Sequence, residues 1–549
     1  MTFSPPVMAA PPQPPPEAQA RSVRRISGPT GWSLLLGAAA TLICAIGLGR
    51  PAPWIDESVT VLAVRRSWPD LGRFILHFDA PLGLYYTMLK PWAAFSSSIF
   101  WLRIPSAIAA VVTVTLLTAW VGRHFSLPVG VAAGALLLAL PTFSRFAQEA
   151  RPYAAVMALG VACTVLWWRT CHDGGIPTRM AYGVTVMVLP LLHLLALAVV
   201  AVQLAAMLPF GRRIRLRVLG WAGVPLLLAS PAFWFINEKA HGVAHPRTMS
   251  WPHLWLTFTE VFGSDAILEL VLVLAALGVV RTLCTKDAVR RHLLLYALGW
   301  GLSTPVIVAI TAAAGQKTLV ARYMLVSLPG WAIVAGEGIL AIAWCLSFLT
   351  RPLCPPLSVP RQRTAPQDAD TEAAGTGSGT GRSSATRRPF RSVGLVWTAV
   401  SIVTAVLVIA QLGWSDQVLE RTKAGHGQGD PSALLTELRL PADRGVAVFT
   451  PGTVSELNIR ADAPDLANRM PLYQSPDRSG RVMRAPRSGA KAVAALRPYD
   501  QLAVLMFAGA EDLKKLVLSM KGLADFTIDE IQSSHGWSMV LMHRVRWTA

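Results

Sequence analysis

The hydrophobic pattern of this chain is a long series of apolar runs separated by short polar gaps. Runs of about 20 residues, the length at which an α-helix crosses the hydrocarbon core of a bilayer, recur from Trp32 to Trp414. The fold class predicted is a polytopic α-helical membrane protein. The pattern predicts eleven transmembrane helices, at approximately residues 31–49, 100–121, 126–143, 152–168, 181–193, 194–209, 218–236, 266–282, 293–313, 323–348 and 393–413.

The polar segments divide the chain into five parts. Residues 1–30 are Pro-rich and are predicted to be disordered, whereas residues 31–348 hold ten of the predicted spans. Residues 349–392 include a Gly/Ser/Thr-rich stretch and predict a flexible linker, which precedes the last span at 393–414. Residues 415–549 predict a small α/β domain, with strands at 446–449, 502–507 and 537–545 and a helix at 512–520.

Two regions of the pattern need a closer look. Residues 181–209 fit either two short spans or one long tilted helix. The gap between the first two spans is long, and residues 57–67 and 81–95 within it predict two helices that lie at the membrane interface. An enzyme that builds a site at the membrane surface needs such a loop.

Charge gives the orientation of the predicted helices. The net charge is +19, yet only 15% of the residues are charged, and the arginines gather in gaps such as 212–217 and 281–291. Positive charge marks cytoplasmic gaps, so the N-terminus and the linker 349–392 are expected inside and residues 415–549 outside. No nucleic-acid signature accompanies the positive charge, so we expect no nucleic-acid partner. Glu337 is the clearest ionisable residue inside a span, and the sequence predicts no role for it.

The first candidate for chemistry is the pair Asp56 and Glu57, directly after the first span. Two carboxylates at the membrane surface could activate an acceptor hydroxyl or hold a divalent cation such as Mg²⁺ or Mn²⁺. Glu149 is a second acidic group that could join Asp56 at such a metal. The alternative is structural, because Asp56 could cap the next helix, with Glu57 favouring its dipole.

The other candidates also fall on the side predicted to be outside. We expect Asp79 to cap a helix that Pro81 starts, and Tyr85 and Tyr86 follow as an aromatic pair that could line a sugar or lipid groove. An interfacial anchor is the alternative for the two tyrosines. The remaining candidates for a substrate pocket are Gln148, Glu149, Tyr153 and His193, and those for binding a phosphate are Arg151, Lys317, Arg322 and Tyr323.

In chain order these segments resemble the GT-C superfamily of membrane glycosyltransferases, in particular bacterial relatives of protein O-mannosyltransferases and lipid A aminoarabinose transferases. The resemblance covers roughly residues 31–348. It rests on Asp56-Glu57, the segment from Asp79 to Tyr86, the Gln-Glu-Ala-Arg-Pro-Tyr segment from Gln148 to Tyr153, the later histidine, and Arg322-Tyr323.

The resemblance implies a transferase that inverts the anomeric carbon at the extracytoplasmic face of a bacterial plasma membrane. It implies a polyprenyl-phosphate donor of a mannose- or pentose-type sugar and a glycan, lipid or protein acceptor. A phosphate leaving group needs positive charge more than a proton, and the acceptor hydroxyl needs a base, for which Asp56 is the first choice. The alternative function is a secondary transporter or lipid flippase, but the sequence lacks the internal repeats of that class.

Overall fold

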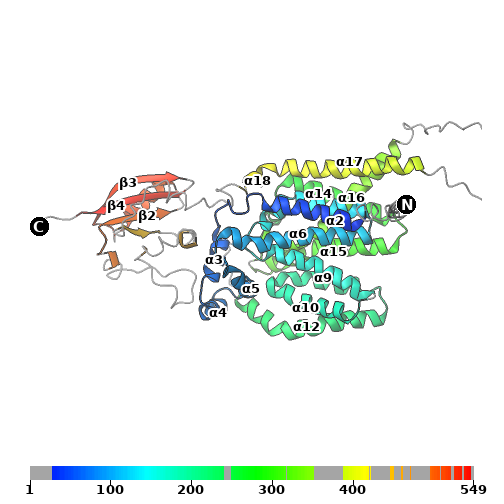
Figure 1. Cartoon of the computed structure of the whole chain (residues 1–549), viewed down its shortest axis with the longest axis horizontal. Helices are drawn as coiled ribbons and strands as arrows, with labels where there is room; N and C mark the ends of the chain where they lie inside the picture. The colour runs from blue at the N-terminus through cyan, green and yellow to red at the C-terminus, as the bar shows by residue number, and fades with distance from the viewer. Residues whose placement is uncertain are drawn as a thin grey trace, which may run out of the picture.

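The computed structural model describes residues 28–172, 174–239, 249–316, 318–350, 388–419 and 421, together with parts of 446–545. The predictions for residues 1–30 and for the linker 349–392 concern segments that lie almost wholly outside these described residues. The described chain forms a bundle of long helices and a small sheet (Figure 1). The predicted polytopic helical fold is confirmed.

Each of the eleven predicted spans coincides with helical structure. The helices are α2 (Pro29–Ala45), α6 (Ile99–His124), α7 (Leu127–Ala139), α9 (Tyr153–Cys171), α10 (Ile176–Leu192), α11 (Leu197–Ala206), α12 (Arg212–Lys239), α14 (Asp265–Leu283), α15 (Ala288–Ala313), α16 (Leu328–Leu349) and α17 (Arg388–Leu412). By length and composition, seven described helical segments can each cross a membrane, or eight if α7 and the following α8 (Pro141–Ala147), bent by 72°, count as one span.

Residues 181–209 form two helices rather than one. The first, α10, ends at Leu192, and a 3-10 turn, η2 (Leu194–Ala196), leads into α11. His193 stands at the break with an extended backbone, φ −159° and ψ 107°. The structure therefore decides between the two alternatives that the sequence left open.

The loop between α2 and α6 contains one helix more than predicted. Its elements are α3 (Ile55–Val64), α4 (Trp68–His77), the 3-10 turn η1 (Ala80–Leu82) and α5 (Gly83–Ala93). The unpredicted helix, α4, starts where Ser67 accepts a hydrogen bond from the Asp70 N–H, with Pro69 in its first turn. Figure 1 shows α3, α4 and α5 gathered at the end of the bundle opposite the N-terminus. Short helices α13 (Trp251–Phe262) and α18 (Trp414–Leu419) and the 3-10 segment η3 (Ala321–Ser327) complete the described bundle.

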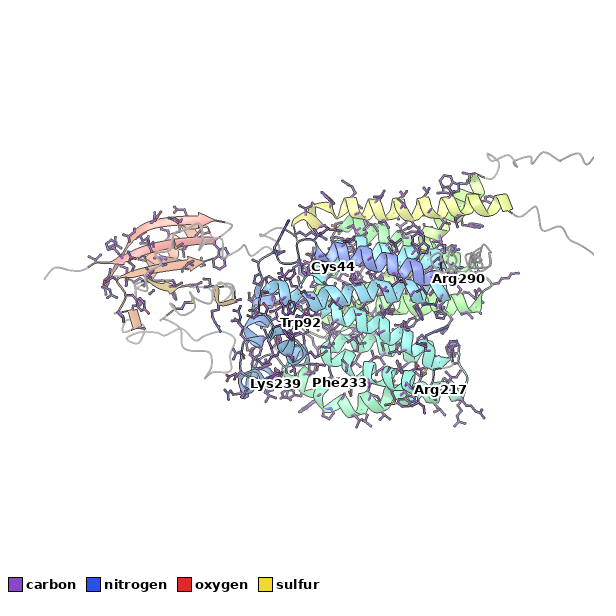
Figure 2. All side chains as sticks on the ribbon, in the orientation of Figure 1. Cys44, Trp92, Arg217, Phe233, Lys239 and Arg290 are labelled. Carbon is purple, nitrogen blue, oxygen red and sulfur yellow. The ribbon has the colours of Figure 1, made fainter. Side chains whose placement is uncertain are left out.

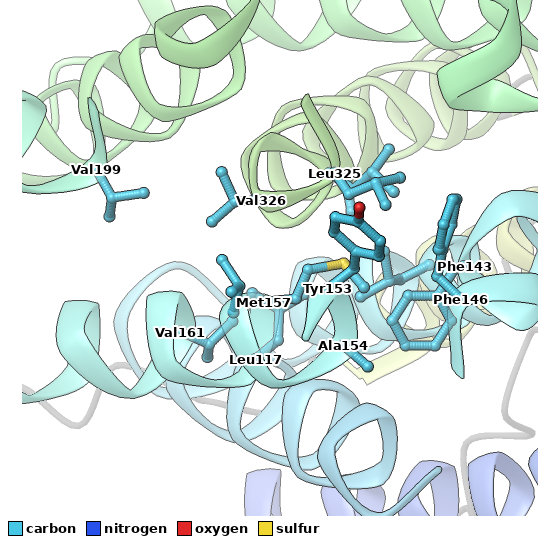
Figure 3. Packing of buried hydrophobic residues seen from close by; sticks show 14 of the residues in the cluster. Leu117, Phe143, Phe146, Tyr153, Ala154, Met157, Val161, Val199, Leu325 and Val326 are labelled. Atoms are coloured by element: carbon cyan, nitrogen blue, oxygen red, sulfur yellow. The ribbon is translucent and has the colours of Figure 1, made fainter. Parts of the chain in front are cut away.

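Glycines let α14 and α16 approach closely. A Cβ at Gly338 would lie 1.8 Å from the Leu274 carbonyl oxygen, and one at Gly278 would lie 2.2 Å from that of Val334. Neither position tolerates a side chain without displacing the partner helix. Apolar side chains fill the rest of the bundle, as in the cluster around Met157 and Val326 (Figure 3).

Glu337, the ionisable residue without a predicted role, lies in the middle of α16 and is fully buried. Arg290 of α15 holds it in a fork, with Nε 2.9 Å from Oε1 and Nη2 2.7 Å from Oε2, and Arg281 of α14 pairs with the same carboxylate. Figure 2 shows Arg290 toward the end of the bundle where the N-terminus lies, and Cys44 and Trp92 toward the other end. The glutamate therefore ties three helices together.

The C-terminal part forms a four-stranded sheet in the order β1-β2-β4-β3. Its elements are β1 (Val446–Phe449), β2 (Gln501–Met506), β3 (Phe526–Ser534), β4 (Trp537–Arg544) and the helix α23 (Ala510–Ser519). The strands β1 and β2 are parallel, and β4 pairs antiparallel with both β2 and β3. The sequence did not predict β3, because the irregularity between Ile528 and Glu530 interrupts its alternation of apolar and polar residues.

Candidate active site

The two adjacent carboxylates of α3 have different surroundings. The helix begins at Ile55 after Trp54, and no side chain caps it, so the alternative in which Asp56 caps the helix is wrong. The Asp56 side chain is 20% exposed, whereas the Glu57 side chain is fully enclosed. Successive helical residues point about 100° apart, which sends one carboxylate toward the surface and the other into the bundle.

Two guanidinium groups flank the Asp56 carboxylate. Its Oδ2 lies 3.5 Å from Nη2 of Arg151 and 3.7 Å from Nε of Arg322. These distances allow electrostatic attraction, but Oδ2 is buried and accepts no hydrogen bond in the structure. Arg151 also donates to the Asp56 carbonyl oxygen at 3.1 Å. Asp56 is thus a partly exposed carboxylate beside two cations, one of its oxygens lacking a hydrogen-bond donor.

Glu57 pairs with Arg103 of α6, a residue that the sequence did not single out. The guanidinium Nε donates to Oε1 at 2.8 Å and Nη2 donates to Oε2 at 2.6 Å. The Ala150 N–H donates to Oε1 at 2.7 Å. Both oxygens of Glu57 are therefore occupied inside the protein. The Glu57 side chain is enclosed and pairs with Arg103, whereas that of Asp56 is partly exposed.

Asp79 and Tyr86 connect to the same arginine. Asp79 precedes η1 but does not cap it; its Oδ2 accepts a hydrogen bond from the Tyr86 hydroxyl at 2.6 Å. Arg151 Nη1 lies 3.4 Å from that hydroxyl oxygen and donates to it. Burial raises the pKa of Asp79 and that of Tyr86. Tyr85 is also buried, with its ring centroid 6.1 Å from that of Tyr86, so the tyrosine pair packs inward rather than anchoring at the interface.

The segment from Gln148 to Tyr153 is mainly engaged within the protein. Gln148 donates to the carbonyl oxygens of Cys44 and Ile46 at 2.9 and 2.8 Å, at the C-terminal end of α2. Glu149 is buried and accepts from Arg145 Nε at 3.1 Å. These two side chains thus hold the loop in place rather than facing outward.

Tyr153 and His193 belong to an aromatic row beside Arg322. Tyr153 packs in the apolar cluster with Phe146, centroid to centroid 5.2 Å (Figure 3), and its ring lies 6.1 Å from that of His193. The His193 ring lies 5.3 Å from that of Tyr323, and its Nδ1 is buried without a hydrogen-bond partner. The structure brings these predicted residues together, although their sequence positions are far apart. Lys317 lies outside the described residues.

Trp54 and Arg145 are further neighbours that the sequence did not single out. The guanidinium carbons of Arg145 and Arg322 each lie 5.7 Å from the centroid of the Trp54 ring, within cation–π range. The i, i+4 spacing of Arg145 and Glu149 could have indicated their ion pair from the sequence. Arg103 could also have been noticed, because it is an arginine inside an apolar run.

The sequence left open whether the carboxylates hold a divalent cation. Among the described residues, no group of three or more His, Cys, Asp or Glu side chains could hold a metal ion. The two suggested ligands, Asp56 and Glu149, each lie beside arginine.

The structure is similar to solved structures of membrane transferases. ArnT from Cupriavidus metallidurans bound to undecaprenyl phosphate matches with a TM-score of 0.55 and 12% identity over 93% of this chain and 98% of that one. Its apo state matches with a TM-score of 0.54 and 13% identity over the same shares. The arabinosyltransferase EmbB from Mycobacterium smegmatis gives a TM-score of 0.38 and 15% identity over 71% of this chain and 39% of that one. Neither a protein-family model nor a curated protein matches the sequence. At these identities the likeness to ArnT establishes the fold.

Proposed function

Since this chain has the GT-C fold, we propose that it is a membrane glycosyltransferase that moves a sugar from a polyprenyl-phosphate donor to an acceptor hydroxyl. The sugar is of the mannose or pentose type, and the acceptor is a glycan, a lipid or a protein. The site lies at the end of the bundle that carries α3, α4 and α5. We assign this end to the extracytoplasmic face, as the charge bias of the sequence predicts, and the membrane to a bacterial plasma membrane, as the family resemblance implies.

The observation that carries the proposal is the position of Asp56. Its carboxylate is partly exposed, it stands beside Arg151 and Arg322, and its Oδ2 has no hydrogen-bond donor. The exposed part of this carboxylate can accept a proton from an acceptor hydroxyl. The two guanidinium groups can accept the negative charge that develops on the departing phosphate. The proposed base therefore lies within 3.5 and 3.7 Å of the two arginines proposed to bind the phosphate.

The proposed reaction uses these groups in one displacement. The acceptor oxygen forms its bond to the anomeric carbon while the bond from that carbon to the phosphate oxygen breaks. Asp56 takes the hydroxyl proton, and the polyprenyl phosphate leaves with the electron pair, held by Arg322 and Arg151. Attack from the face opposite the phosphate inverts the anomeric carbon, as the family resemblance implies.

An open apolar groove supports the class of donor. It lies between α11 and α15 and is almost entirely apolar, and α11 begins shortly after His193. The groove is lined by Ala198, Val202, Ala205, Gly299, Leu302 and Val306. An isoprenoid tail needs such a surface and nothing polar along it. We place the donor tail there, with its phosphate at Arg322.

The test is transfer by the purified protein in lipid nanodiscs, with polyprenyl-phosphate mannose and polyprenyl-phosphate pentoses as donors. Asp56→Asn should lower turnover by about 100-fold or more, the usual scale for a lost general base. Asp70→Asn is the matched control, because Asp70 is in the same loop but pairs with Arg73 at the surface. In sealed proteoliposomes, movement of a labelled polyprenyl-phosphate lipid between leaflets without sugar transfer would support the flippase alternative instead.

Orientation needs a separate measurement. In a background without native cysteines, a cysteine at Ser97 or Ser475 should react with an impermeant thiol reagent applied to intact cells, and one at Ser378 should not. The basis is the bias of positive charge toward the cytoplasm. Labelling at Ser378 would contradict the eleven-span topology.

A further inference from the structure

We propose that Arg103 is a positioning residue for this reaction, one that holds Asp56 and Arg151 in their working geometry without touching a substrate. The inference rests on the proposed function. It assigns a role to the buried ion pair of Arg103 and Glu57, which the reaction itself does not use.

Arg103 joins segments that are distant in the sequence. Besides its fork to Glu57, its Nη1 donates to the carbonyl oxygens of Leu48 and Pro51 at 3.0 and 2.9 Å. Glu57 in turn accepts the Ala150 N–H at 2.7 Å. One guanidinium therefore connects α6, the turn after α2, the first turn of α3 and the loop before α9. These hydrogen bonds are 2.6–3.0 Å long, which is within the normal range for protein hydrogen bonds.

We call Arg103, Glu57 and Ala150, which are joined by these hydrogen bonds, the hub. Two candidate site residues are next to hub residues in the sequence. Asp56 precedes Glu57, and Arg151 follows Ala150. Consecutive Cα atoms are about 3.8 Å apart across a rigid peptide plane, so a shift of either hub residue moves its neighbour. The 3.5 Å separation of Asp56 and Arg151 is thus set by the ion pair behind them.

The chemistry of the hub requires arginine. A planar guanidinium can bind both oxygens of one carboxylate and two carbonyls at once, whereas a lysine ammonium has three donors and no fork. Arg103→Lys keeps the positive charge that Glu57 needs and loses the two-point geometry. Because the Arg103 side chain has no exposed surface, any effect on transfer must pass through other residues.

The test is a double-mutant cycle on purified, folded protein. Arg103→Lys should lower kcat by about tenfold or more, since a displacement of about 1 Å can cost 100-fold. In an Asp56→Asn background the same change should cost less than about twofold, because residues that act as one unit are not additive. Arg290→Lys, in the similar fork at the other end of the bundle, should leave kcat unchanged.

A second measurement does not depend on turnover. In a background without native cysteines, a cysteine replacing Asp56 reports its own position through its rate of reaction with a charged methanethiosulfonate. Arg103→Lys should change that rate by about threefold or more, an effect expected of a shifted, partly exposed thiol. Arg290→Lys should not. If Arg103→Lys abolishes folding, Glu57→Asp, which keeps both charges and shortens the carboxylate side chain, replaces it in both measurements.

Each outcome decides one claim. An equal loss from Arg103→Lys with and without Asp56, or an unchanged labelling rate, overturns the positioning role and leaves the proposed function standing. An Asp56→Asn variant with parental turnover overturns the proposed base, whatever Arg103 does.

Discussion

The two ends of the helical bundle contain nearly the same buried ion pair in different settings. At one end Arg103 binds Glu57 through bonds of 2.8 and 2.6 Å, and at the other Arg290 binds Glu337 through bonds of 2.9 and 2.7 Å. The second pair joins helices only, and Arg281 shares its carboxylate. The first pair also binds loop carbonyls and a loop N–H.

The comparison teaches that a buried arginine–glutamate pair has no single meaning. Such a pair seldom adds stability over a well-packed apolar contact, yet breaking it is costly, so it enforces one arrangement. Around Glu337 the enforced arrangement is the packing of α14, α15 and α16. Around Glu57 it is the path of the loops that carry Asp56 and Arg151. The same chemistry therefore serves the scaffold at one end and the candidate site at the other.

The largest expected effect is a difference in the free energy of unfolding between variants of the two ion pairs, which differ in solvent exposure. Glu57→Gln leaves Arg103 charged and wholly enclosed, which should lower the free energy of unfolding by about 3–5 kcal/mol. Glu337→Gln should cost clearly less, because Arg290 and Arg281 are 18% and 27% exposed and can reach water or lipid phosphate. Thermal unfolding of both variants in one detergent measures the difference. A larger loss for Glu337→Gln would contradict this account.

The next effect concerns binding at the candidate site. Arg322→Ala should reduce kcat/KM for the donor roughly tenfold to 100-fold. This corresponds to the loss of about 1.5–3 kcal/mol, the contribution of a charge-assisted hydrogen bond to phosphate. Steady-state kinetics with varied donor measure it. Arg73→Ala is the control, since Arg73 is an exposed arginine of the same loop, paired with Asp70. Parental donor kinetics in folded Arg322→Ala would remove the phosphate assignment.

A smaller effect is expected from the neutral hydrogen bonds of Gln148 than from the Arg103–Glu57 ion pair. Gln148→Ala removes the donors to the Cys44 and Ile46 carbonyls and should cost about 1–2 kcal/mol of stability, less than Glu57→Gln. The melting temperature should fall while the donor KM stays near the parental value. A rise in donor KM without a loss of stability would mean that Gln148 contacts substrate, as its sequence context first suggested.

The smallest effect is a pH dependence in the loop. Burial raises the pKa of Asp79 above the usual value of about 3.9, so the folded protein disfavours the ionised form relative to the unfolded chain. The stability linked to Asp79 is full below that value and is lost as the pH rises through the raised pKa.

Asp79→Asn should remove that loss, so its melting temperature relative to the parent should increase from pH 4 upward. Asp70→Asn should show the opposite sign, because the hydrogen bond from Ser67 lowers the pKa of Asp70. Melting curves across the acidic range check both. Parallel curves for parent and Asp79→Asn would show that this carboxyl is not perturbed.

The sequence by itself determined the helical membrane fold, because each bilayer crossing needs its own apolar run and the runs are local in the chain. It also determined which polar segments fall between the spans, and so which residues gather at one end. The break at His193 was the kind of detail that length alone could not decide. The start of α4 depended on a local serine cap.

Only the tertiary structure decided what each polar side chain does. Asp56 and Glu57 are neighbours of equal charge in the sequence, and their difference comes from Arg103, 46 positions from Glu57 in the chain. Asp56 lies beside Arg322 because η3 and α3 meet at the same end of the bundle. Burial and ion pairing are properties of packed surfaces, so residue type and spacing could nominate these side chains but could not assign them.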